Sequence, residues 1–206
     1  MKQMKHTHLI LKAGLTFVMF MFAINVFAAK PYVQGKYNID PVHTRVSFVI
    51  PHFVISVVEG RFDDVSGEFT LAEPFAASSA SVNVAIKSID TGVKKRDDDL
   101  RSKNFFDEAK YPTMKFVSKS VSGTPESFKV VGALTIKDVT KEVTLDGKYT
   151  GSLKDPWGNQ RVALQLSGII QRTDFHISYH KMTEIGPDIG DDVTIRIWVD
   201  GTLAKK

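Results

Sequence analysis

The chain has 206 residues, a formal net charge of +4 and no cysteine, and 43% of its residues are hydrophobic. This length fits one domain of roughly 100 to 200 residues, and the absence of cysteine excludes a fold held by disulfide bonds. The basic residues form no stripe interleaved with aromatic ones, so the composition gives no support for nucleic-acid binding.

The N-terminal segment has the organisation of a cleaved export signal. Three lysines precede an apolar run over residues 15–26, and Ala28 provides a small residue at the cleavage point. A membrane anchor is the alternative, but the run has 12 residues and a spanning helix needs roughly 20. We therefore expect residues 1–28 to be removed and residues 29–206 to form a single domain in the periplasm. Of the 27 Lys and Arg residues, three lysines leave with the signal, so the mature chain carries 24 basic against 23 acidic residues.

Short stretches of alternating apolar and polar residues run through the mature chain, which is typical of strands that bury one face. Turn residues separate many of these stretches, and their short spacing favours antiparallel neighbours. The pattern therefore predicts an all-β protein. In chain order the apolar positions are Val46, Phe48 and Ile50; Phe62; Phe69 and Leu71; Val82, Val84 and Ile86; Met114 and Phe116; Phe128 and Val130; Val143 and Leu145; Val162, Leu164 and Leu166; Phe175 and Ile177; and Ile195 and Ile197.

One segment, residues 91–112, interrupts the strands. Its charged run over residues 94–101 is too polar for a strand, and Phe105 and Phe106 follow it. We expect one or two short helices here, which would cap an opening of the sheet.

A large sheet with one apolar face must close around that face. An eight-stranded barrel encloses an interior that side chains can fill or that can hold one small ligand. Four of the 14 phenylalanines lie in the export signal, which leaves ten in the mature chain. That aromatic content suits a filled core as well as a ligand tunnel, so the strand pattern alone leaves both open.

A charged motif at residues 96–107 is followed by Tyr111-Pro112 and stands among further landmarks in a fixed order. The set resembles the YceI-like family of polyisoprenoid-binding periplasmic proteins, over about residues 36–200. The resemblance implies an extended lipocalin-like antiparallel β-barrel of about eight strands, with short helices near its mouth. It also implies an interior that holds a long isoprenoid chain. The other landmarks are residues 40–43, 46–52, 60–62, 132–141, 155–158 and 172–175.

The implied ligand is a polyisoprenoid or an isoprenoid quinone, and we expect no other cofactor. Its tail has no hydrogen-bonding groups, so binding must come from removing apolar surface from water, at about 25 cal/mol per Å². Ordinary packing is the alternative for each lining residue, and a one-residue shift in register would reverse which side chains face inward. We assign the lining to Val46, Phe48, Ile50, Phe62, Phe69, Val84, Ile86, Met114, Phe116, Leu166 and Phe175.

Polar groups at the mouth have two interpretations. In the first, Arg96 and Arg101 present guanidinium donors to a quinone or phosphate headgroup, and His52 contacts the same headgroup. In the second, the two arginines pair with carboxylates and hold the mouth segment against the sheet. Asp99 and Asn104 replace the usual His and Asp of the family motif, a change that bears on the choice of headgroup. The candidate carboxylates are Asp97, Asp107 and Asp174.

The sequence offers no candidate catalytic residue and no metal site. His176 and His180 share a face of a predicted strand, but no acidic or Cys partner stands at ligand spacing. There is no G-x-S-x-G elbow, no Cys nucleophile and no glycine-rich phosphate loop before a helix.

Three functional classes follow. The first is a periplasmic carrier for a long-chain isoprenoid lipid, without catalysis and with transient membrane contact. The second is an enzyme that acts on a quinone or lipid headgroup at the barrel mouth. The third is a filled barrel that acts through its surface. We predict the first, as a monomer or a dimer.

Overall fold

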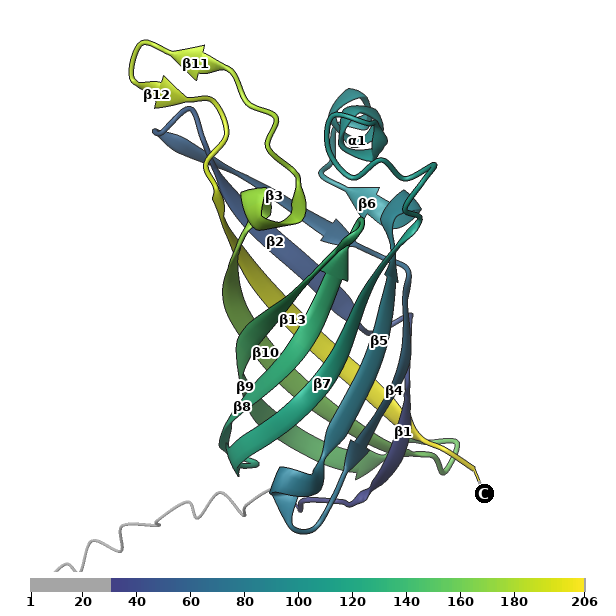
Figure 1. Cartoon of the computed structure of the whole chain (residues 1–206). Helices are drawn as coiled ribbons and strands as arrows, with labels where there is room; N and C mark the ends of the chain where they lie inside the picture. Colours follow the sequence, from purple (N-terminus) through teal and green to yellow (C-terminus); the bar gives the residue numbers. More distant parts are fainter. Residues whose placement is uncertain (1–30, 206) are drawn as a thin grey trace, which may run out of the picture.

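Eight antiparallel strands close into a barrel, which confirms the predicted fold (Figure 1). The computed structural model describes residues 31–205, so the predicted export signal lies outside the described residues. In order around the barrel, the strands are β1 (Gly35–Ile39), β4 (Val65–Leu71), β5 (Ser79–Ala85), β7 (Thr113–Thr124), β8 (Ser127–Ile136), β9 (Val139–Lys154), β10 (Gln160–Gln171) and β13 (Asp192–Leu203). Strand β13 pairs with β1 and so closes the sheet.

Three further strands extend one side of the barrel wall. They are β2 (Arg45–His52), β3 (Ser56–Phe62) and β6 (Ile89–Asp90). Strand β13 pairs with β1 through residues 201–203 and with β2 through residues 194–198, so a single strand serves two neighbours in succession. This makes the barrel longer on the β2–β3 side.

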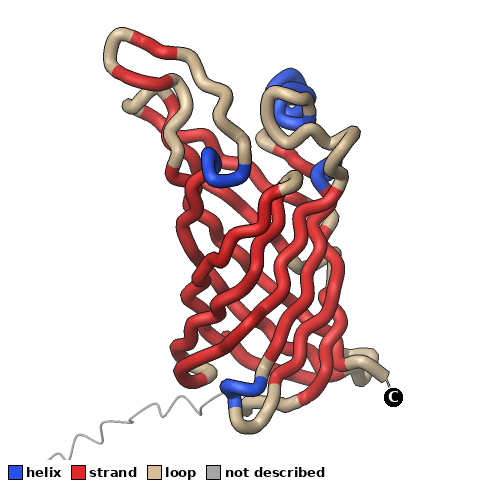
Figure 2. The backbone as a smooth tube through the Cα atoms, in the orientation of Figure 1, coloured by secondary structure: helices blue, strands red, loops and turns tan. Residues whose placement is uncertain are grey.

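The two ends of the barrel differ (Figures 1 and 2). We call the end that carries helix α1 (Lys94–Arg101) and the hairpin of β11 (Met182–Thr183) and β12 (Gly186–Pro187) the mouth. The opposite end, the base, carries the one-turn helix η1 (Phe75–Ala77) and the C-terminal residues. Helix α1 confirms the short helix predicted from the charged run.

The apolar residues of each alternating strand face the interior of the barrel. Val46 lies opposite Ile197, and Phe48 lies opposite Ile195, in the β2–β13 ladder. All four side chains line the interior cavity. Trp198, which lies on the opposite face of β13, is 53% exposed. Alternation therefore gave the correct inward face, as expected for a sheet with a period of two.

Two predicted strand segments differ in the structure: one ends a residue early, and the one around Phe175 is not a strand. Strand β5 stops at Ala85, and Ile86 opens the turn η2 (Ile86–Ser88), because its N–H donates to Pro112 O at 2.9 Å instead of to a neighbouring strand. Phe175 lies in the turn η3 (Arg172–Phe175), where the chain bends over the barrel mouth. The prediction of a strand at His176 and His180 was wrong for the same reason, since both follow this turn.

Candidate functional site

The barrel is hollow. It contains a cavity of about 1050 Å³, at the upper end of the roughly 300–1,000 Å³ found for ligand pockets. The walls are the inward side chains of β1 to β5, β7 to β10 and β13, and most of them are apolar. The interior is therefore not filled by the aromatic residues of the chain, which was one of the two possibilities the sequence left open.

The structure brings most of the predicted site residues together around this cavity. Ile86 and Phe175 do not line it: both are buried within the wall and its turns. Arg101 also lies outside the lining. Contact of any of these residues with a ligand stays a prediction. The predicted residues that line the cavity are Val46, Phe48, Ile50, His52, Phe62, Phe69, Val84, Arg96, Met114, Phe116 and Leu166.

Four phenylalanine rings lie flat against the inner wall because each covers a glycine. A methyl group at any of these glycines would overlap the ring. The missing side chain thus provides the space that keeps the ring out of the centre of the barrel, an arrangement known from aromatic rings over glycines in designed sheets. The pairs are Phe48 over Gly60, Phe69 over Gly201, Phe116 over Gly132 and Phe128 over Gly147.

Aromatic rings close the base of the cavity. Phe75 and Phe128 both line it, with their ring centroids 5.2 Å apart. Tyr32 packs against Phe75 with centroids 5.8 Å apart and against Tyr149 with centroids 5.6 Å apart. Two of these contacts are edge-to-face, a favoured geometry for aromatic pairs. An apolar tail in the cavity would therefore meet rings at the base.

The mouth of the cavity is polar. Helix α1 places Lys95, Arg96 and Asp99 among the lining residues, and the segment around the β11–β12 hairpin places Lys181 and Asp188 there. An amphiphile with its tail in the barrel would have its headgroup at this end. Lys95 and Lys181 make no ion pair within residues 31–205. The sequence interpretation missed both lysines, because nothing in their local sequence distinguishes them from surface lysines.

The two predicted headgroup arginines bind protein groups. Arg96 donates to Thr91 Oγ1 at 2.7 Å and to Thr91 O at 2.9 Å. Arg101 pairs with Asp98 at 2.6 Å. The carboxylate partners predicted from the sequence were wrong: Asp97 instead accepts from Thr91 N and Oγ1, at 2.9 and 2.6 Å. Arg96 and Asp97 thus fix α1 to Thr91 in the segment before it, whereas the pair between Arg101 and Asp98 lies within α1. Contact of either arginine with a headgroup stays a prediction.

The two departures from the family motif lie in contact with each other. Asp99 Oδ1 accepts from Asn104 Nδ2 at 3.3 Å and from Ser102 Oγ at 3.3 Å. Asp99 also lines the cavity mouth. A carboxylate therefore occupies a place at the mouth where the resemblance leads one to expect a histidine.

Arg172 anchors the loop that forms one side of the mouth. Its guanidinium is 4% exposed and donates to four backbone carbonyls at 2.7 to 3.2 Å. Burial lowers the pKa of Arg172, and Asp191 and Asp188 oppose that shift. An ion pair to Asp191 at 3.1 Å supplies the counter-charge. The four carbonyls belong to Ile177, Tyr179, Ile189 and Gly190.

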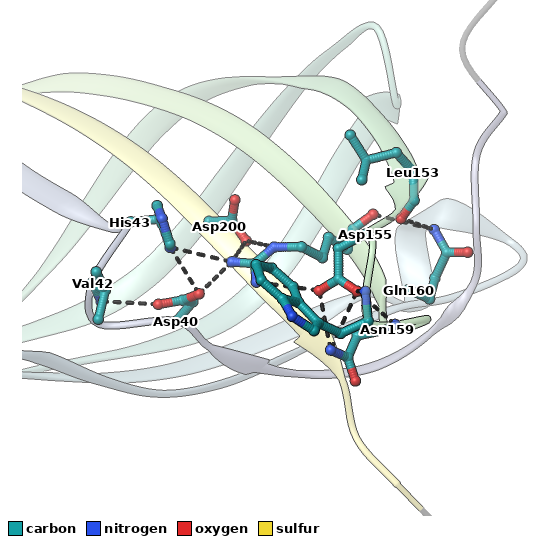
Figure 3. A network of polar contacts seen from close by, with 10 residues as sticks. Asp40, Val42, His43, Leu153, Asp155, Asn159, Gln160 and Asp200 are labelled. Atoms are coloured by element: carbon teal, nitrogen blue, oxygen red, sulfur yellow. Dashed lines mark hydrogen bonds and ion pairs between the residues drawn. The ribbon is translucent and has the colours of Figure 1, made fainter.

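A second arginine holds the base together (Figure 3). Arg161 Nη2 donates to Asp200 Oδ1 at 2.8 Å and also to Asp40 Oδ2, while its Nη1 lies 3.8 Å from Asp155 Oδ2. Burial alone would raise the pKa of Asp40, but hydrogen bonds from His43 and Arg161 outweigh this and lower it to about 2. Two landmarks of the resemblance, residues 40–43 and 155–158, thus meet in one structural cluster.

Comparison with known proteins agrees with this geometry. The family model described as YceI-like domain matches residues 37–200. The chain belongs to the YceI-like family. Protein YceI of Escherichia coli is 37% identical over 193 residues, which cover 93% of this chain and 97% of that protein.

Solved structures share the barrel. Burkholderia cenocepacia BcnA has a TM-score of 0.70 and 23% identity, covering 79% of this chain and 98% of its own. A polyisoprenoid binding domain from Saccharophagus degradans, implicated in plant cell wall breakdown, has a TM-score of 0.60 and 16% identity, covering 82% of this chain and 98% of its own. At these identities the similarity is one of fold.

Two further features are absent from the described residues. No helix of residues 31–205 is long and apolar enough to span a membrane. In the same range, no cluster of three or more His, Asp or Glu side chains has an arrangement suited to a metal ion.

Proposed function

We propose that this protein is a periplasmic carrier that holds a polyisoprenoid or isoprenoid quinone, with the tail in the barrel and the headgroup at the mouth. The observation that carries the proposal is the hollow interior, whose walls are mostly apolar and whose charged lining residues lie toward the mouth. The polyisoprenoid binding domain with the same fold supports this choice of ligand. The role is binding without catalysis.

The chemistry of the lining suits such a tail. Each buried CH₂ contributes about 0.8 kcal/mol relative to water, and an isoprenoid chain makes no demand for hydrogen bonds along the wall. The wall also lacks fixed polar contacts that would select one chain length. Selectivity therefore comes from the depth of the cavity down to Phe75 and Phe128 and from the polar groups at the mouth.

The experiment is organic extraction of the purified protein followed by mass spectrometry. We expect a long-chain isoprenoid in the extract of the parent protein. Leu166→Trp, which adds bulk inside the cavity, should reduce the retained lipid about tenfold or more. The indole would occupy space that the tail needs, and two displaced CH₂ groups at about 0.8 kcal/mol each already correspond to about tenfold. Ile169→Trp is the matched control on the same strand, because Ile169 is 66% exposed on the outer face.

The outcome decides between the remaining classes. An extract free of lipid, from a protein that also fails to retain added geranylgeraniol through gel filtration, would contradict the carrier role. Equal lipid retention by Leu166→Trp and Ile169→Trp would place the lipid outside the cavity and would contradict the proposal as well.

A further inference from the structure

The turn between β2 and β3 has an unusual composition. Its residues are Phe53, Val54 and Ile55, whereas turns are dominated by Gly, Pro, Asn, Asp and Ser. The three side chains are 45%, 58% and 81% exposed, in that order. Three consecutive apolar side chains in solvent at a hairpin tip are unfavourable for a protein that remains in water.

The backbone of this turn is also strained. Phe53 has φ of 52° and Val54 has φ of 65°. Positive φ is a genuine outlier for a β-branched residue, and such conformations cost on the order of 1–3 kcal/mol each and cluster at functional sites. The strain directs apolar side chains outward at a place where a glycine or asparagine would form the turn without cost.

A second apolar tip lies beside the first (Figure 1). In the β11–β12 hairpin, Met182 is 70% exposed and Ile185 is 61% exposed. The two hairpins are joined through the backbone: Phe53 N donates to Asp188 O, and Gly190 N donates to Pro51 O, both at 2.9 Å. We call these two tips together, residues 53–55 and 182–185, the rim.

The rim stands directly beyond the cavity mouth. His52 and Pro51, which precede the first tip, line the cavity, and so does Lys181, which precedes the second. The charges in and around the rim are mixed: Lys181 precedes the second tip, Glu184 lies within it, and Asp188 follows it. The rim is therefore distinguished by its apolar side chains and not by net charge.

We propose that the rim inserts its apolar side chains into the interfacial layer of a lipid bilayer and places the cavity mouth against the membrane. The inference deepens the proposed function by naming the surface through which a lipid would enter or leave. A bilayer is the partner indicated because it is the one phase that both covers apolar hairpin tips and supplies a water-insoluble ligand at the adjoining mouth. Docking itself requires no ligand in the barrel.

The test is flotation of the purified protein with vesicles of phosphatidylethanolamine and phosphatidylglycerol. The double variant Ile55→Asn/Met182→Asn should lower the vesicle-bound fraction about tenfold or more, because two exposed apolar side chains no longer enter the bilayer. Leu153→Asn is the matched control: Leu153 is 60% exposed in β9, near the base. Binding of the parent should persist at high salt, since insertion of apolar groups is not screened.

Several results would overturn the proposal. The rim variant could float as well as the parent, or Leu153→Asn could fail to float. Flotation of the parent could be lost completely at high salt. Sedimentation experiments could also show that the rim mediates only association between copies of this chain. Retention of geranylgeraniol without vesicles is measured in parallel. A rim variant that retains geranylgeraniol but does not float would separate docking from the carrier function. A parent protein that retains no geranylgeraniol would contradict the carrier function alone.

Discussion

At the scale of single residues, Arg172 explains how an irregular loop is held at the barrel mouth. The loop after η3 has few ladder bonds of its own, and its carbonyls are satisfied by one guanidinium. An arginine suits this place because its planar fork directs five N–H donors to different acceptors, which a lysine cannot do.

Replacing Arg172 with methionine should therefore destabilise the protein. We expect a loss of about 3 kcal/mol or more in the free energy of unfolding, because four backbone carbonyls lose their charged donor. Loss of the ion pair to Asp191 adds little, because that carboxylate is 54% exposed. Urea unfolding measures the loss, and hydrogen exchange should show lost protection over residues 176–191. Arg196→Met, at an exposed arginine of β13, is the control; equal stability of the two variants would contradict the assigned role.

At the scale of strands, the glycine–phenylalanine pairs give four rings room against the barrel wall. Phe128 in β8 lies directly opposite Gly147 in β9. The three atoms closest to a methyl group at Gly147 all belong to the Phe128 ring. This pair therefore offers a clean test of how rings are kept against the wall.

Gly147→Ala should force the Phe128 ring away from the wall and into the cavity. We expect a loss of about 1–3 kcal/mol in the free energy of unfolding, as for other overpacked sites, together with reduced retention of geranylgeraniol. Adding Phe128→Leu to the same chain should restore part of both, because the smaller side chain removes the overlap. The explanation would be wrong if Gly147→Ala left stability and retention unchanged, or if the second substitution restored neither.

Alternation made the strands and their inward face predictable, because both follow from local sequence. The strand pattern alone could not predict the hollow interior, which the family resemblance implied, since the hollow depends on rings such as Phe116 lying over glycines of other strands. The partners of Arg96 and Arg101 were assigned wrongly for a related reason. Many carboxylates stand near them in sequence, and the choice of Thr91 and Asp98 depends on how α1 packs. The apolar turn at residues 53–55 was missed because it contains none of the usual turn residues.

At the scale of the whole molecule, a hollow barrel cannot rely on a central core. The side chains that line the cavity give up contacts that a filled interior would provide. Stability comes from the layer of buried apolar side chains in the wall, which includes Phe62, Val65 and Val162, and from the strand ladders. It also comes from the two ends, where Arg172 holds the mouth, and the aromatic rings and Arg161 hold the base. Under the proposed function, a tail that left a bilayer for this cavity would pass from one apolar environment to another, so loading and release would be nearly balanced.

The cluster at the base closes the barrel where β13 meets β1, and this gives a pH dependence. Asp40 has a pKa of about 2 in the folded protein, below the roughly 3.9 of an unfolded Asp. Because the folded pKa is lowered, the stabilisation is complete above about pH 4 and is lost as pH falls through about 2.

Asp40→Asn should therefore lower the free energy of unfolding by about 1–2 kcal/mol at pH 7. The difference in stability between this variant and the parent should shrink between pH 4 and pH 2. Glu68→Gln removes an exposed ion pair to Lys36 and serves as the control. Urea unfolding at several pH values measures all three proteins, and a constant difference between the parent and Asp40→Asn down to pH 2 would show that the Asp40 carboxylate does not secure the closure.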